Sequence, residues 1–178
     1  MDNKVIVALV SVGVGWCLSQ FTEIVKSKVK NRKLKNVLKR ELDDISFKLI
    51  KSREYCLSFS KALNTGDNFD FIPLKVQTLV HDNYYPEIYA SYKQPERIAL
   101  SAIYGQLEQL NNLLENFSLR NSKQHYIQIF QVVEITQGSI EQFFKDPSKE
   151  LGQNKEKMSA INSEIEKYKM SILAAELC

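Results

Sequence analysis

The chain has 178 residues, of which 44% are hydrophobic and 25% are charged, a composition typical of a globular protein rather than a disordered one. Only six glycines and four prolines occur, too few for turn-rich all-β folds or for folds built on glycine-rich phosphate loops. The length accommodates one ordinary domain plus an anchor, and the abundance of leucine, lysine, glutamate and glutamine predicts an all-α protein.

An uncharged segment near the N-terminus predicts a membrane anchor. Val5–Thr22 contains 18 residues without a charge. As a helix it would span about 27 Å, close to the roughly 30 Å hydrocarbon core of a bilayer. We therefore expect residues 1–25 to form a single transmembrane helix. Two other interpretations stay open: a buried first helix of a soluble bundle, and a cleaved signal peptide, which has its positive charges before the apolar run.

The positive charge of the chain is concentrated directly after this segment. Residues 26–40 carry eight basic side chains and no acidic one, whereas 15 basic residues face 19 acidic ones from Glu41 onward. A nucleic-acid-binding surface spread over the whole domain is therefore not expected. The positive-inside rule places this juxtamembrane helix start in the cytoplasm and the N-terminus outside.

The basic segment also predicts a contact with anionic lipid, worth about 1 kcal/mol for each cation near the membrane surface. The alternative is that the cluster only fixes the orientation of the anchor. The residues predicted to contact the membrane surface are Lys26, Lys28, Lys30, Arg32, Lys33 and Lys35.

Small residues recur along one face of the predicted anchor. Ser11, Gly15 and Ser19 are spaced four residues apart and therefore share a helix face. In lipid, such a face lets two helix backbones approach closely. We predict that it packs against a second copy or a partner helix, with chance spacing as the alternative.

Apolar residues at intervals of three or four predict four helices in a cytosolic domain over residues 41–178. The first continues from the basic segment and ends at the breaker cluster Asn64–Asn68. A second begins near Pro95, a third spans about Lys123–Lys145, and a fourth follows Ser148. Together they predict an antiparallel helical bundle. The first helix has a coiled-coil-like stripe consisting of Leu34, Leu38, Leu42, Ile45, Leu49, Ser52, Cys56, Phe59 and Leu63.

One connection in this bundle is long. The link 64–94 has about 30 residues, and a structureless loop of that length is uncommon in a compact domain. We expect it to hold a short helix near Lys75–His81 or to be functional. Tyr85, Tyr89 and Tyr92 fall on one helix face, which is typical of packing over the open end of a bundle. A recognition surface is the alternative.

The chain carries few groups suited to catalysis or metal binding. The two histidines, His81 and His125, have no carboxylate or thiol at ligand spacing, so neither a metal site nor a cofactor is expected. Glu41, Asp43 and Asp44 lie on a helix without a partner motif and are expected to be solvated. The three cysteines are scattered, which indicates reduced thiols in a cytosolic domain.

One short motif resembles that of a known enzyme family. Arg120-Asn121-Ser122-Lys123-Gln124-His125 is similar to the R-N-x-x-x-H motif of HEPN ribonucleases, a family of all-α bundles. The resemblance implies that Arg120 holds an RNA phosphate and that His125 moves a proton, at a dimer interface and without metal. The alternative is a polar turn followed by an ordinary helix-start histidine.

These patterns predict a membrane-anchored helical interaction module that binds a protein partner or itself at the cytoplasmic membrane face. No catalytic role is expected on this interpretation. Two alternatives remain. One is a membrane-tethered, metal-independent ribonuclease that acts as a toxin or defence effector, and the other is a soluble helical bundle with a buried N-terminal helix.

Overall fold

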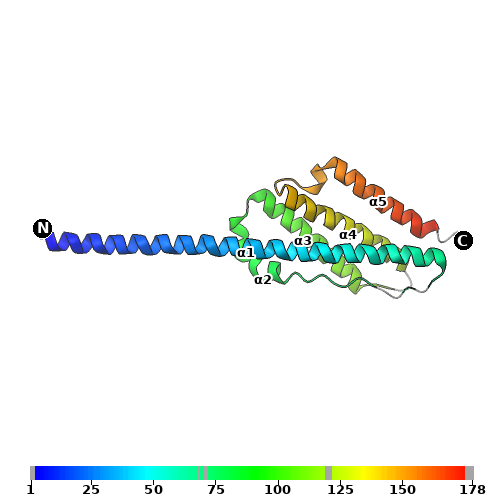
Figure 1. The fold of residues 1–178 in the computed structure, drawn as a ribbon, viewed down its shortest axis with the longest axis horizontal. Coiled ribbons are helices and arrows are strands. Elements are labelled where there is room, and N and C mark those ends of the chain that lie inside the picture. The colour runs from blue at the N-terminus through cyan, green and yellow to red at the C-terminus, as the bar shows by residue number, and fades with distance from the viewer. Residues whose placement is uncertain (1–2, 68, 70–71, 119–121, 175–178) are drawn as a thin grey trace.

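The computed structural model describes residues 3–67, 69, 72–118 and 122–174, with side chains from residue 11 onward. All regular elements in this part of the chain are helices, so the prediction of an all-α helical bundle is confirmed (Figure 1). In chain order they are α1 (Asn3–Thr65), α2 (Leu79–Ile88), η1 (Tyr89–Ser91), α3 (Gln94–Glu115), α4 (Ser122–Lys145), η3 (Leu151–Gln153) and α5 (Lys155–Ala174).

Helix α1 belongs to the bundle over only part of its length. It has 63 residues and is therefore about 95 Å long. Figure 1 shows its N-terminal part projecting from the bundle as a lone helix, while its C-terminal part lies along the other helices. Every side chain in residues 11–30 is exposed, whereas Leu38, Leu42 and Ile45 are at most 1% exposed. Residues 11–30 are called the projecting half below.

The end of α1 lies where the breaker cluster predicted it. Gly66 follows the last helical residue and has a φ of 76°, a left-handed conformation that glycine adopts without a Cβ clash. The amide of Asp67 donates to the carbonyl of Ala62 at 3.1 Å, the hydrogen bond that closes a Schellman motif. The glycine thus ends the helix and lets the Asp67 amide satisfy one of its last carbonyls.

Helix α4 is the central helix of the bundle. It packs against α1, α3 and α5 and runs opposite to all three (Figure 1). Its side chains Ile129, Phe130 and Ile140 are at most 1% exposed. Residues 72–78, called the crossover below, lead back along the bundle to α2 (Figure 1). Helices α1 and α3 therefore run in the same direction.

This crossover corrects the predicted position of the short helix in the long connection. The helix begins at Leu79, not at Lys75. The side-chain amide of Asn111 on α3 accepts a hydrogen bond from the Val76 amide and donates one to the Val76 carbonyl, both at 2.8 Å. Because the backbone of Val76 is already paired with α3, the chain stays non-helical up to this point.

Polar contacts connect α1 to α4 and α5 in addition to the apolar core. The guanidinium of Arg53 donates to Glu134 on α4 and lies 3.7 Å from the carboxylate of Glu164 on α5. The hydroxyl of Tyr168 on α5 donates to the backbone carbonyl of Cys56 at 2.9 Å. These specific pairs favour one register of α1 against its two neighbours.

The fourth predicted helix begins later than Ser148. Leu151, expected on that helix, lies on η3, where it is 7% exposed. Helix α5 begins at Lys155, and the side chain of Asn154 accepts a hydrogen bond from the Lys157 amide at 3.2 Å, as an N-cap residue does.

Candidate functional site

The projecting half of α1 exposes large apolar side chains on opposite sides of the helix. Val12 is 72% exposed, Trp16 66% and Phe21 66%. Val12 and Phe21 are nine residues apart, which places them about 180° apart around the helix axis at roughly 100° per residue. None of the described residues covers either side. The predicted packing face lies here as well, and a Cβ built on Gly15 has no described atom within 4 Å.

The basic residues of segment 26–40 of α1 receive few acidic partners from the bundle. Lys30 forms an ion pair with Glu87 of α2. The ammonium group of Lys35 donates to the carbonyl of Ser91 at 2.6 Å and lies 4.0 Å from the centre of the Tyr92 ring. The other six basic side chains of this segment form no ion pair within the described part of the chain. They are Lys26, Lys28, Arg32, Lys33, Lys39 and Arg40.

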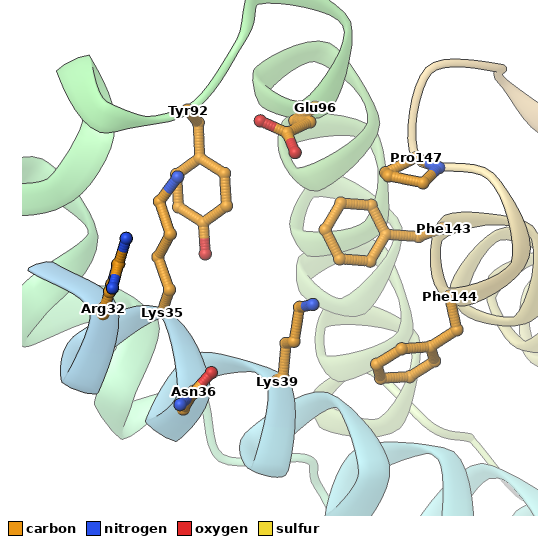
Figure 2. A pocket seen from close by; sticks show the side chains of 9 residues that line it. All are labelled: Arg32, Lys35, Asn36, Lys39, Tyr92, Glu96, Phe143, Phe144 and Pro147. Carbon is orange, nitrogen blue, oxygen red and sulfur yellow. The ribbon is translucent and has the colours of Figure 1, made fainter.

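Some of these cations line a cavity of about 320 Å³, which opens where α1 joins the bundle (Figure 2). We call it the basic–aromatic pocket. Helix α1 provides one wall. The start of α3 and Tyr92, two residues before it, provide a second, and the end of α4 with the following turn provides a third. The lining residues are Arg32, Lys35, Asn36, Lys39, Tyr92, Glu96, Phe143, Phe144 and Pro147.

Local sequence signals place these side chains. Arg32 and Lys39 are seven residues apart on α1 and therefore share a helix face. Glu96 is held by the capping box of α3, in which its carboxylate accepts the Lys93 amide at 2.7 Å. Phe144 stands one residue before the end of α4, and Pro147 lies in the turn beyond it, where a proline prevents the helix from continuing.

The pocket has an excess of positive charge. Its three cations and single carboxylate give a formal charge of +3 − 1 = +2. Tyr92 is 5% exposed, and its hydroxyl is buried without a hydrogen-bond partner among the described residues. Burial raises the pKa of this phenol well above its usual range, and the charges of Glu96 and Tyr85 raise it further. The phenol therefore stays protonated and keeps its proton available for donation.

Sequence reasoning missed the role of one acidic residue of α1, Glu41, outside the pocket lining. Glu41, expected to be solvated, is only 9% exposed. Its carboxylate accepts hydrogen bonds from the amides of Val80 and His81 at 2.6 and 3.0 Å and from the Tyr104 hydroxyl at 2.8 Å. Because those amides begin α2, Glu41 caps that helix and holds it against α1. No motif around Glu41 indicates this contact, since its partners are 39 or more residues away.

Of the two catalytic candidates in the ribonuclease-like motif, the structure describes His125 but not Arg120. Arg120 lies outside the described residues. The Nδ1 atom of His125 accepts a hydrogen bond from the Ser118 amide at 3.4 Å, and its ring lies 5.5 Å from that of Phe117. His125 is at the start of α4, whereas the basic–aromatic pocket is at its end, about 27 Å away along the helix. The structure does not bring the two places together.

Comparisons with protein-family models, with curated proteins and with solved structures find no match for this chain. In the described part of the chain, no helix is both long enough and apolar enough to cross a membrane. Residues 1–10, where the predicted anchor begins, lie outside the residues whose side chains are described. The same part of the chain contains no group of three or more His, Cys, Asp or Glu side chains placed to hold a metal ion.

Proposed function

We propose that this chain is a membrane-anchored helical interaction module, whose bundle binds a protein partner or a second copy at the cytoplasmic membrane face. The observation that carries this proposal is the projecting half of α1, which exposes large apolar side chains on opposite sides of the helix. A helix that is apolar all round is normally buried in a protein core or spans a membrane. The bundle leaves residues 11–22 of the projecting half, which carry no charge, uncovered.

Lipid is the occupant that fits this surface best. A protein cover would need several helices arranged around α1, because Val12 and Phe21 point in opposite directions. Lipid chains cover all sides at once. The uncharged stretch Val5–Thr22 has about the length of a hydrocarbon core, and charge rises sharply after it.

The basic residues nearest this stretch have the spacing expected at a membrane surface. Lys26 and Lys28 follow Thr22 by four and six residues, or about 6 and 9 Å along the helix. The headgroup layer is roughly 5–8 Å thick on each side, so these two ammonium groups would lie at its outer edge. Neither forms an ion pair with a described carboxylate, and the positive-inside rule orients them toward the cytoplasm.

The bundle itself offers an exposed apolar surface for a partner. Leu74 is 82% exposed on the crossover, and Leu79 is 62% exposed at the start of α2. The neighbouring residue Val76 is 2% exposed and is fixed to α3 by Asn111. The two leucines are thus presented from a segment that is fixed to the bundle, which reduces the ordering cost of binding.

Membrane fractionation of paired variants tests the anchor. Val12→Arg with Val14→Arg places two charges in the projecting half, at an insertion cost of about 5–7 kcal/mol. We expect this variant to move from the carbonate-resistant membrane fraction to the soluble fraction. Phe47→Arg with Ile50→Arg is the matched control, since both side chains are exposed on the bundle part of α1. It should remain in the membrane. A freely soluble wild-type protein would contradict the proposed anchor.

Co-purification tests the interaction surface. The full chain is isolated from detergent-solubilised membranes, and the accompanying proteins and the oligomeric state are determined by mass spectrometry and light scattering. Leu74→Asp with Leu79→Asp should remove the partner or the second copy. Met170→Asp, at a position 63% exposed on α5, should not. Equal recovery with both variants would place the binding surface elsewhere.

A further inference from the structure

The basic–aromatic pocket combines positive charge with an unused hydrogen-bond donor. Arg32 and Lys39 both line this cavity and form no ion pair within the described residues. The hydroxyl of Tyr92, which Figure 2 shows directed toward α1, is buried and unpartnered. A buried donor without an acceptor is unfavourable, because it has lost its hydrogen bond to water and gained none in return. An anion in the pocket would supply the acceptor that all three groups lack.

The opposite wall suits a flat or apolar group. Figure 2 shows Phe143 and Phe144 facing the cavity from the end of α4, across from the cations of α1. Phe143 is 3% exposed and forms the base of this wall, whereas Phe144 is 41% exposed and presents a ring to the opening. A bare inorganic anion would leave this wall unused. A ligand that carries its charge on an organic group would contact both sides.

We propose that the basic–aromatic pocket binds a phosphate monoester. Arg32, Lys39 and the Tyr92 hydroxyl hold the phosphate, and the group that carries it packs against Phe144. A phosphate monoester has a charge of about −1.5 to −2 at neutral pH, which matches the formal +2 of the pocket. The guanidinium provides the paired donors that suit phosphate oxygens. The cavity volume of about 320 Å³ lies at the lower end of the roughly 300–1,000 Å³ typical of small-ligand sites.

The remaining polar groups favour a nucleotide over a simpler ester. Glu96 is the single acidic side chain of the pocket and repels phosphate. Its Oε2 atom accepts the Lys93 amide, and its other lone pairs can accept the N–H groups of a purine edge. A base stacked on Phe144 would add a favourable contact between two ring faces. GMP, whose base edge offers two adjacent N–H donors, is therefore the first probe.

The lipid phosphatidic acid also carries a phosphate monoester. The distance of the pocket from the membrane surface determines whether this headgroup can reach it. Arg32 follows Thr22 by ten residues, about 15 Å along α1, and Lys39 follows it by about 25 Å. The headgroup layer is only about 5–8 Å thick, and a helix tilt of 40° still leaves Arg32 about 11 Å beyond the hydrocarbon edge. If residues 5–22 are the anchor, as proposed above, Arg32 lies beyond the lipid headgroups, and a soluble phosphate monoester is the favoured ligand.

Calorimetric titration of the full-length protein tests the pocket. The protein is placed in nanodiscs of neutral lipid and titrated with GMP, AMP and ribose 5-phosphate. A parallel arm measures binding of the detergent-purified protein to nanodiscs that contain phosphatidic acid. We expect saturable binding of GMP that is tighter than that of ribose 5-phosphate. Binding to phosphatidic acid alone would support the pocket with the lipid as its source.

Charge-matched variants identify the binding residues. Arg32→Gln with Lys39→Gln should weaken binding by at least about tenfold, since two charged hydrogen bonds are lost. Lys33→Gln with Arg40→Gln removes the same charge from the same segment but outside the pocket, and should change binding less than about threefold. Tyr92→Phe should keep the fold and weaken binding, because it removes only the unpartnered hydroxyl.

Two results would overturn the proposal. One is the absence of binding from both sources at millimolar concentration. The other is an equal loss in the two charge variants, which would indicate general attraction of anions to α1. Circular dichroism verifies that each variant remains folded. Membrane fractionation of the same variants measures membrane association independently of ligand binding. Loss of the proposed ligand binding and loss of the proposed anchor are therefore distinguished.

Discussion

The two parts of α1 differ in what surrounds them, although they form one uninterrupted helix. In the projecting half, apolar residues occupy opposite sides and all are exposed. In the bundle part, they recur at intervals of three or four, and Leu38, Leu42 and Leu49 are at most 1% exposed. A stripe of apolar side chains is buried by packing one face of the helix against other helices. Apolar side chains on opposite sides of a helix are buried only when an apolar environment surrounds the helix.

The difference also concerns what stabilises each part. Each fully buried leucine or isoleucine of the stripe contributes about 1.5–3 kcal/mol of burial free energy to the bundle. The projecting half gains none of this from the fold, and valine-rich helices are only marginally stable in water. In a bilayer, by contrast, the absence of water forces the backbone to pair internally, and a helix does so completely.

The two cysteines of α1 give the largest expected contrast, because each part contains one. Cys56 is 0% exposed, and burial raises the pKa of its thiol to about 12. At pH 8 only about one folded molecule in 10⁴ therefore carries the reactive thiolate. Single-cysteine variants in native membranes are treated with a membrane-impermeant maleimide. We expect Cys17, shielded by lipid, and Cys56, shielded by the bundle, to remain unlabelled.

Urea distinguishes protection of a cysteine from maleimide by lipid from protection by the folded bundle. It unfolds the bundle and should release Cys56 for labelling, while Cys17 stays protected because the bilayer remains. Rapid labelling of Cys17 in native membranes would show that the projecting half is not in lipid. Labelling of Cys56 before urea is added would contradict its burial in the bundle.

Truncation of one leucine in each part gives the next largest contrast. Leu42→Ala removes a side chain that is 0% exposed and leaves a cavity, so we expect a loss of about 2–5 kcal/mol in the free energy of unfolding. Leu18→Ala changes a side chain that is 62% exposed and should leave bundle stability within about 0.5 kcal/mol. Urea unfolding in detergent, followed by tyrosine fluorescence, measures both. Equal losses would mean that the projecting half folds back onto the bundle.

Two glycines extend the comparison to close packing. A Cβ on Gly138 of α4 would lie 2.5 Å from Ile161 Cδ1 and 3.2 Å from Leu151 Cδ2, so Gly138→Ala should overpack the contact with η3 and α5. The expected net loss is at most about 2 kcal/mol, because both atoms end flexible side chains that can move and the higher helix propensity of alanine offsets part of the strain. Gly15→Ala has open space and should not alter bundle unfolding. Thermal unfolding of both variants measures the difference, and a gain in stability for Gly138→Ala would show that Ile161 and Leu151 move aside without strain.

The smallest expected effect is at His125. The Nδ1 atom of this residue accepts one hydrogen bond, from Ser118 at 3.4 Å. His125→Ala should therefore cost at most about 1 kcal/mol of stability and leave membrane association unchanged. Incubation of wild-type protein and variant with total RNA and EDTA checks the ribonuclease alternative. Cleavage by the wild type that disappears in His125→Ala, with the fold intact, would replace the proposed role by an enzymatic one.

The apolar periodicity and the helix-breaking residues of the sequence were sufficient to predict most of the helices. The stripe through Leu42 and Leu49, the stop before Gly66 and the start of α3 near Pro95 are all present in the structure. These features depend on residues within one or two turns of each other, so local patterns specify them. The small helix in the long connection was expected, but its start was not, because it depends on the distant side chain of Asn111.

The candidate pocket likewise combines features that the local sequence sets with features that tertiary packing sets. The sequence by itself determined that Arg32 and Lys39 belong to an uncompensated basic segment, since charge is a property of the residues. Only the tertiary structure decided that they meet Tyr92 and Phe144, which are more than 50 positions away in the chain. It likewise turned Glu41 from a predicted surface acid into the cap of α2. Contacts of this kind depend on how whole helices pack, and packing is set by the summed burial of many side chains rather than by any short motif.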